Sequence, residues 1–92
     1  MSIRITAVHM SDNGSAHEHI SELAWKDYGS GATDTSSRSD LVRWISDNGK
    51  AFVESASSKV PVGVIQPAVG MPHLRTYADE TWTDGLLSLP RY

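Results

Sequence analysis

The chain has 92 residues and a formal net charge of −3, with 8 Lys and Arg residues scattered among 11 Asp and Glu residues. This length predicts a single domain over residues 1–92 with a small core, and the scattered basic residues make nucleic-acid binding an unfavoured function. Because the sequence has no cysteine and no apolar stretch long enough for a leader or a membrane span, we expect a cytoplasmic protein that does not enter a membrane.

The first part of the chain predicts β-strands. Apolar residues recur at the two-residue period of a half-buried strand over residues 2–10, and the polar residues 11–15 are typical of a turn. Residues 17–26 then predict a second strand that pairs with the first as a hairpin, although the apolar residues of this segment also fit the spacing of a helix. Residues 32–36 predict a short polar edge strand.

One helix is predicted over residues 37–48. Ser37 is suited to cap its first turn, and Gly49 is the expected left-handed residue that ends it. The apolar positions i, i+3 and i+4 form a stripe that should face the sheet. This stripe consists of Leu41, Trp44 and Ile45.

The second half of the chain predicts further short strands, at residues 51–55, 60–65, 74–79 and 81–83. Pro61 has no N–H to donate to a sheet ladder, so it predicts an edge position or a bulge for its strand.

The last apolar cluster is either a part of the core or an arm that docks on a partner. We favour the core, because burial of three leucines contributes roughly as much as the whole stability of a domain this small. These leucines are Leu86, Leu87 and Leu89. Together, the elements predict an α+β fold: an antiparallel twisted sheet of five to six short strands, with the helix at about residues 37–48 packed on one face.

Six short stretches, spread over nearly the whole chain, stand out in combination: residues 3–6, 17–20, 37–38, 74–79, 82–84 and 86–90. The last three resemble the C-terminal signature of a family of small bacterial proteins catalogued as domain of unknown function 3892, and the others occur in the same order in that family. Glu80 stands where the family often has Gly, which predicts a different turn, because Glu disfavours positive φ. The resemblance implies a shared fold and no particular activity.

Three histidines raise the question of a metal site. His9 and His17 would lie near each other across the predicted hairpin, with His19 one pleat further along the same face. Three neutral imidazoles can hold zinc with one open position. We favour the simpler interpretation that they are exposed polar residues, because no accompanying carboxylate partners occur at recognisable spacing.

Several charged residues have an equally simple interpretation. Asp79, Glu80 and Asp84 could serve as acid–base groups or hold a hard cation, but Asp in such positions more often forms turns. Arg4 and Arg75 would bind an anion if their strands were neighbours, and they otherwise lie on a solvated strand face.

Aromatic residues are the best candidates for a partner-binding surface, because they dominate interface energetics. The candidates are Trp25, Tyr77 and Trp82. No nucleophile, base and orienting group occur together, so we expect no catalytic residue and no cofactor. The favoured function is a small non-catalytic binding or interaction module, an adaptor or regulator, whose partner is a protein or a second copy of the chain. The alternative is a small metal-binding protein or metal-dependent hydrolase that uses His9, His17 and His19.

Overall fold

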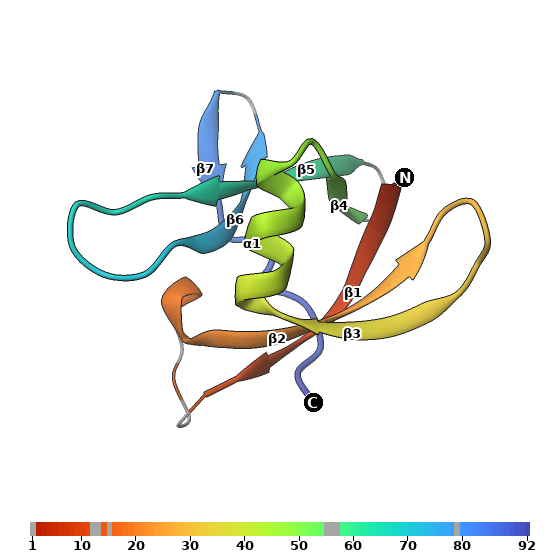
Figure 1. Ribbon diagram of the computed structural model, residues 1–92, viewed down its shortest axis with the longest axis horizontal. Helices are drawn as coiled ribbons and strands as arrows, with labels where there is room; N and C mark the ends of the chain where they lie inside the picture. Colours follow the sequence, from red (N-terminus) through yellow and green to blue (C-terminus); the bar gives the residue numbers. More distant parts are fainter. Residues whose placement is uncertain (1, 12–13, 15, 55–57, 79) are drawn as a thin grey trace.

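The computed structural model describes residues 2–11, 14, 16–54, 58–78 and 80–92. Within these residues the chain forms seven strands, one α-helix and one short 3-10 turn (Figure 1). In chain order the elements are β1 (Ser2–Met10), η1 (His17–His19), β2 (Ile20–Asp27), β3 (Thr33–Ser37), α1 (Arg38–Ser46), β4 (Lys50–Glu54), β5 (Lys59–Ile65), β6 (His73–Ala78) and β7 (Thr81–Thr83).

The α+β class is confirmed, but the sheet is larger than predicted and is not purely antiparallel. It has seven strands in the order β3-β2-β1-β4-β5-β6-β7. β1 pairs with β4 in parallel, over Ser2, Ile3 and Arg4 only. Parallel neighbours require a long crossover connection, and here β2, β3 and α1 make that connection. The predicted antiparallel sheet was wrong at this one pairing, because local alternation says nothing about which distant strand becomes a neighbour.

The predicted hairpin of the first two strands is confirmed, since β1 and β2 pair antiparallel. β3 lies at the edge of the sheet beside β2, as predicted for residues 32–36. The helical alternative for residues 17–26 is wrong apart from the single turn of η1. Residues 12, 13 and 15 of the predicted turn lie outside the described residues.

The helix begins as predicted and ends earlier. Ser37 caps α1, and its Oγ accepts a hydrogen bond from the Asp40 N–H at 3.2 Å. The last helical residue is Ser46, and Asn48 rather than Gly49 takes the left-handed conformation, with φ at 76°. Gly49 is needed for a different reason, because a Cβ at this position would lie 2.3 Å from the Trp44 ring.

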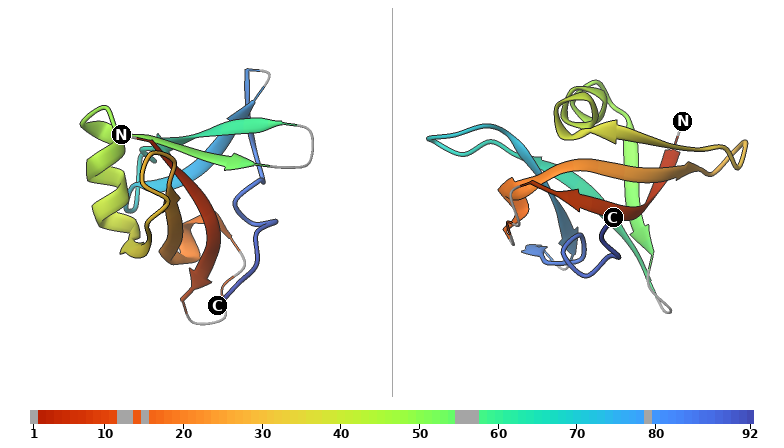
Figure 2. Two further views of the ribbon diagram at one scale, coloured as in Figure 1. Left: turned by 90° about the vertical axis from the view of Figure 1, so that its right-hand side faces the viewer. Right: turned by 90° about the horizontal axis from the view of Figure 1, so that it is seen from below.

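The two halves of the sheet enclose the core. The half formed by β4–β7 stands at a steep angle to the half formed by β1–β3 (Figure 2). α1 closes one side of the space between them and contacts β2, β3, β5 and β6 (Figure 1). The C-terminal tail closes the opposite side (Figure 2). The buried apolar residues form one cluster: Ile3, Ile5, Val8, Ile20, Leu23, Leu41, Ala51, Val53, Val62, Leu74 and Leu86.

The apolar stripe of the helix and the leucines of the tail both belong to this core. Leu41 is buried, and Trp44 and Ile45 pack against the cluster. Leu86 is completely inaccessible to solvent. Leu87 and Leu89 pack around it. The prediction that the tail completes the core is therefore confirmed.

The tail also completes the sheet. After Arg4, β1 has no further pairing with β4, and the tail takes the free side of the strand. The Val8 N–H donates to the Pro90 carbonyl at 2.9 Å, and the Tyr92 N–H donates to the Val8 carbonyl at 3.1 Å. β1 thus has a hydrogen-bonded neighbour on this side at both of its ends.

The sequence predicted an edge position or a bulge for Pro61. The structure places it away from the edge of the sheet. β5 is an interior strand, between β4 and β6. Pro61 is the last residue paired with β4 along β5, and Val62 is the first paired with β6. The missing N–H therefore falls where the strand exchanges one neighbour for the other, which is how an interior strand accommodates a proline.

Among the described residues, no helix combines the length and the apolarity needed to cross a membrane.

Replacing Leu86 with Ala should lower the free energy of unfolding by about 2–5 kcal/mol, because it leaves a cavity in the centre of the core. Val69→Ala is the matched control, since Val69 is 91 % exposed, and it should change stability by less than about 0.5 kcal/mol. Chemical denaturation monitored by circular dichroism measures both. Equal stability of the two variants would mean that the tail does not belong to the core.

Candidate functional site

α1 and the tail both contribute to the enclosed core, and among the described residues the tail also reaches the outer face of the sheet, where Tyr92 packs on His9 and donates a hydrogen bond to Glu22. Strand alternation places every second side chain on this face. The outward residues include two groups of unusual composition, at opposite ends of the sheet. One is an aromatic groove over β5, β6 and β7, and the other is a charged hollow at the ends of β1 and β2.

The aromatic groove is lined by Pro61, Val62, Gly63, Tyr77 and Trp82 and has a volume of 510 Å³. The Tyr77 and Trp82 rings belong to directly paired residues of β6 and β7. Their centroids are 5.0 Å apart and their planes are inclined at 67°, an edge-to-face arrangement that favours aromatic pairs. Tyr77 is 39 % and Trp82 is 41 % exposed. Two large rings in contact with each other therefore form one aromatic surface that faces solvent.

Gly63 makes the groove possible. An added Cβ would lie 3.0 Å from the Trp82 ring, so the missing side chain allows the indole to approach the backbone of β5. Tyr77 faces outward because its neighbours Leu74 and Thr76 are buried at the inward positions of the same strand.

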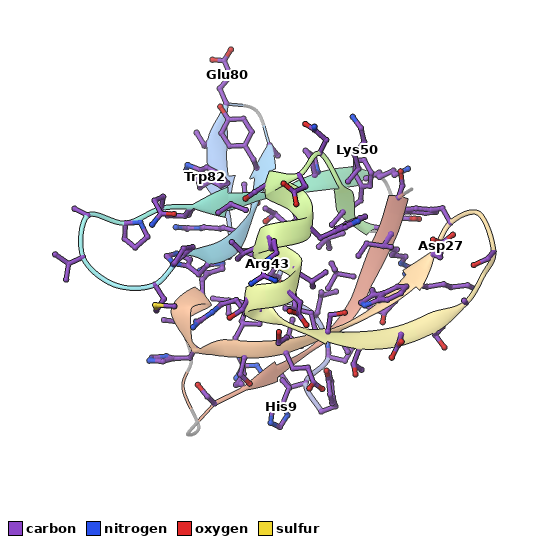
Figure 3. The ribbon with its side chains drawn as sticks, viewed as in Figure 1. His9, Asp27, Arg43, Lys50, Glu80 and Trp82 are labelled. Atoms are coloured by element: carbon purple, nitrogen blue, oxygen red, sulfur yellow. The ribbon has the colours of Figure 1, made fainter. Side chains whose placement is uncertain are left out.

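The β6–β7 turn beside the groove departs from the prediction for Glu80. Its φ is 65°, so Glu80 takes the left-handed conformation, which Glu was expected to avoid. A non-glycine residue in this region costs roughly 1–2 kcal/mol, which the pairing of β6 with β7 must offset. Figure 3 shows Glu80 at the tip of the hairpin, with Trp82 below it. Asp79 lies outside the described residues.

The charged hollow at the other end of the sheet has a volume of 490 Å³. It is lined by Arg4, Lys26, Asp27, Tyr28, Gly29, Ser30, Gly31 and Glu54. Both of its carboxylates have partners. Asp27 Oδ1 accepts from the N–H groups of Gly29 and Ser30, at 2.7 and 2.9 Å, and these bonds, that of Ser30 above all, lower the pKa of Asp27. The Glu54 carboxylate accepts the Tyr28 hydroxyl proton in a hydrogen bond.

The cations of the hollow are less well matched. Arg4 and Lys26 are directly paired residues of β1 and β2 and carry like charges. Among the described residues, no carboxylate lies within 4.0 Å of either cation. Lys59 lies at the rim, with its Nζ 4.2 Å from the Tyr28 ring centroid and 4.3 Å from that of Phe52. Such contacts hold a cation without neutralising it.

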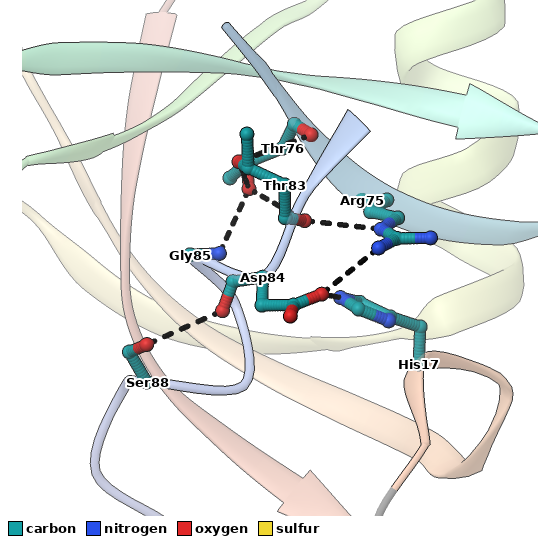
Figure 4. A network of polar contacts seen from close by, with 7 residues as sticks. All are labelled: His17, Arg75, Thr76, Thr83, Asp84, Gly85 and Ser88. Carbon is teal, nitrogen blue, oxygen red and sulfur yellow. Dashed lines mark hydrogen bonds and ion pairs between the residues drawn. The ribbon is translucent and has the colours of Figure 1, made fainter. Parts of the chain in front are cut away.

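Arg75 does not join Arg4, as the anion hypothesis required. The neighbours of β6 are β5 and β7, and those of β1 are β2 and β4. Arg75 instead donates from Nη2 to Asp84 Oδ1 at 2.9 Å and from Nε to the Thr83 carbonyl at 3.1 Å (Figure 4). The Asp84 carboxylate, 71 % exposed, is also 3.8 Å from His17 Nε2. Asp84 thus serves as an ion-pair partner for Arg75.

A buried hydroxyl connects this ion pair to the core. Thr76 Oγ1 accepts the Gly85 N–H at 2.9 Å, lies 2.5 Å from Thr83 Oγ1 and donates to the Thr83 carbonyl at 3.1 Å (Figure 4). Thr76 is completely buried. These bonds fix the turn that follows β7 and directs Leu86 inward, so the network has a structural role.

The three histidines of the metal hypothesis have different partners. His9 Nδ1 contacts the Tyr92 carbonyl oxygen, His17 lies beside Asp84, and His19 Nδ1 accepts the Ala16 N–H at 3.3 Å. In the part of the chain that the structure describes, no three His, Asp or Glu side chains are placed to hold a metal ion. The prediction assumed that His17 lies on a strand. It lies in η1 instead, which turns its ring towards β6.

Trp25 is separated from the other two aromatic candidates. It is partly buried on the inner side of the sheet, and its Nε1 donates to Ser36 Oγ at 2.9 Å. With Leu41 and Trp44 it lines a cavity of 340 Å³ beside α1. The predicted candidates Tyr77 and Trp82 therefore lie together in the groove, and the sequence did not point to Pro61 and Gly63, whose place beside the rings depends on the register of β5 with β6.

Comparison with known proteins gives one match. A family model described as "Protein of unknown function (DUF3892)" matches residues 4–90. No curated protein matches the chain, and no solved structure matches it.

The Thr76 hydroxyl can be tested by the nearly isosteric change Thr76→Val. The variant should lose about 1–3 kcal/mol of stability, because the Gly85 N–H then has no acceptor in a buried position. Thr35→Val on the exposed edge strand is the control and should change stability by less than about 0.5 kcal/mol. Denaturant titration compares the two, and equal effects would contradict the structural role of the network.

The raised pKa of Tyr28 predicts that the protein loses stability at alkaline pH. Desolvation, followed by the hydrogen bond to Glu54, raises the pKa of Tyr28 from its ordinary value of 10.0 to about 12. The neutral phenol is therefore favoured in the folded state, and its contribution is present below pH 10 and is lost as the pH rises towards 12. The pKa of Tyr92 is also raised to about 12, so the phenolate absorbance of the parent should show two late-titrating tyrosines and that of Tyr28→Phe one, and this variant should lose less stability over this pH range than the parent. An unchanged pH profile in that variant would contradict the assignment.

Proposed function

The chain belongs to the DUF3892 family, and we propose that it is a non-catalytic binding module that holds an extended segment of a partner protein in the aromatic groove. The family description assigns no activity, so the proposal depends on the groove. Its main support is the pair of exposed rings, Tyr77 and Trp82, fixed on the outer face of the sheet. Adjacent exposed aromatic rings are frequent anchors of protein interfaces, because Trp and Tyr are enriched among the residues that carry most of the binding energy.

The shape of the groove favours an extended, proline-containing segment as its occupant. Proline-rich segments adopt the polyproline II conformation before binding, and they dock into grooves lined by aromatic rings. The contacting rings of Tyr77 and Trp82 offer one continuous aromatic surface for such a segment, and Pro61 extends the apolar lining beside it. Because the rings are held by strand pairing and by Gly63, binding costs little conformational entropy.

The role is that of an adaptor or regulator, and the absence of cysteine supports a cytoplasmic location. A second copy of the chain is the competing occupant of the groove. Metal binding by His9, His17 and His19 has no observation in its favour among the described residues.

A decamer of proline tests the groove directly. In an NMR titration it should shift the amide signals of β5, β6 and β7, including Gly63 and Tyr77, and leave those of α1 in place. Trp82→Ala should weaken the binding about tenfold or more, because truncation of a central aromatic anchor removes much of the binding energy. Its free energy of unfolding should fall by only about 1–2 kcal/mol, since the ring is 41 % exposed.

Met71→Ala is the matched control, because Met71 is an exposed apolar residue outside the groove and should leave the affinity unchanged. Shifts on α1, or equal binding by Trp82→Ala and the parent, would contradict the proposal. Groove signals that move with protein concentration when no peptide is present would identify a second copy as the occupant, and this would also contradict it.

A further inference from the structure

We propose that the charged hollow formed by Arg4, Lys26 and the Asp27–Gly31 turn binds the phosphate group of a small phosphate monoester. This site is separate from the aromatic groove and does not depend on the function proposed for the groove. The two hollows are lined by different residues and lie over different strands.

The first argument is the pairing of like charges. Arg4 and Lys26 are directly opposite each other on β1 and β2, and both are exposed. Directly opposed side chains on one face have Cβ atoms about 4.5–5.5 Å apart, and like charges at this distance repel. A sheet optimised for stability would place an opposite charge at one of the two positions. A dianion bound between the two side chains would attract both cations and offset their repulsion.

The second argument concerns the surrounding carboxylates, which are already engaged. Asp27 is held by the N–H groups of its own turn, and Glu54 accepts the hydroxyl of Tyr28 and lies opposite Lys59 across the β4–β5 pair. Neither lies within 4.0 Å of the Arg4 guanidinium or the Lys26 ammonium among the described residues. The two cations thus have no ion-pair partner within 4.0 Å among the described residues, although Asp27 and Glu54 keep their negative charges, so the hollow and its rim hold three cations, Lys59 included, against two carboxylates.

The third argument identifies the ligand class. A phosphate monoester carries a charge of about −1.5 to −2 at neutral pH on one compact group, which matches two cations side by side. The Arg4 guanidinium can donate two parallel hydrogen bonds to it, and the Lys26 ammonium adds a point charge. Lys59, over the rings of Tyr28 and Phe52 at the rim, adds a third positive charge nearby. The hollow measures 490 Å³, enough for a small metabolite and open to solvent on one side.

Glycerol 3-phosphate is a suitable probe, with glycerol and dimethyl phosphate as matched controls. In an NMR titration of the full chain, glycerol 3-phosphate should shift the signals of Arg4, Lys26 and Tyr28. Dimethyl phosphate, which carries a single charge, should bind at least several-fold more weakly, and glycerol should not bind. Arg4→Gln/Lys26→Gln should weaken the binding of glycerol 3-phosphate about tenfold or more, through the loss of two charge-assisted contacts.

Arg43→Gln/Arg91→Gln removes the same charge from exposed positions outside the hollow and should leave the affinity within about twofold. The Arg4→Gln/Lys26→Gln variant should unfold at the same or a higher denaturant concentration than the parent, because it relieves repulsion. This stability readout separates a ligand site from a structural ion cluster. Unfolding of that variant at a clearly lower denaturant concentration would overturn the proposal.

Three other results would overturn it. Equal affinity for glycerol 3-phosphate and dimethyl phosphate would mean that the hollow does not select a dianion. Tighter binding of succinate would identify a dicarboxylate as the ligand. Binding to phosphatidylcholine vesicles that contain phosphatidic acid, with no binding of free glycerol 3-phosphate, would assign the hollow to a lipid headgroup instead of a small molecule.

Discussion

The buried hydroxyl of Thr76 accepts the N–H of Gly85 and donates to Thr83, and with these bonds it fixes the turn that follows β7. The direction of the remaining chain depends on this turn. Leu86 enters the centre of the core directly after it, and the backbone then reaches β1, where Val8 pairs with the segment around Arg91. The ion pair of Arg75 with Asp84 supports the same turn from the outside. The hydrogen bonds among two threonines and a glycine thus determine how the final seven residues, 86–92, pack.

The tail and α1 divide the molecule into an enclosed inner side and an outer side. Both contribute apolar residues to the space between the two halves of the sheet, and the tail also reaches the outward side chains of His9 and Glu22 through Tyr92. A small domain seldom leaves many large apolar side chains exposed, because most of them are needed to form its core. The rings of Tyr77 and Trp82 are among the few large apolar side chains that the described part of the chain leaves exposed, and they lie in contact with each other.

Local features of the fold were predictable from the sequence, and non-local ones were not. Alternation over residues 2–10 and the Ser37 cap identify β1 and the start of α1, because both depend on neighbouring residues. The parallel pairing of β1 with β4 is different in kind, since it joins segments almost fifty residues apart and leaves no periodic trace in either. The position of Pro61, at the exchange between two neighbouring strands, has the same cause.

In the candidate sites, too, the local features were predictable from the sequence and the non-local ones were not. Tyr77 was predictable as an outward residue from the alternation of its own strand, whereas Gly63 acquires its role only from the cross-strand approach of Trp82. The pairing of Arg4 with Lys26 depends on the register of the first hairpin, which contains a bulge between Ile5 and Ala7. An error in the local structure of His17 also affected the metal prediction. The histidines formed a cluster only because His17 was placed on a strand instead of in η1.

The pairing of the tail with β1 has a consequence for how the protein is made. A ribosome releases the first strand long before the residues that complete its neighbourhood, so during synthesis Val8 and the residues around it have no partner on one side. Contacts between segments far apart in sequence slow folding, and apolar surface that is exposed before they form invites association between chains. The free side of β1 is therefore completed only when the segment around Arg91 pairs with it, so this part of the sheet depends on a contact between residues more than eighty positions apart.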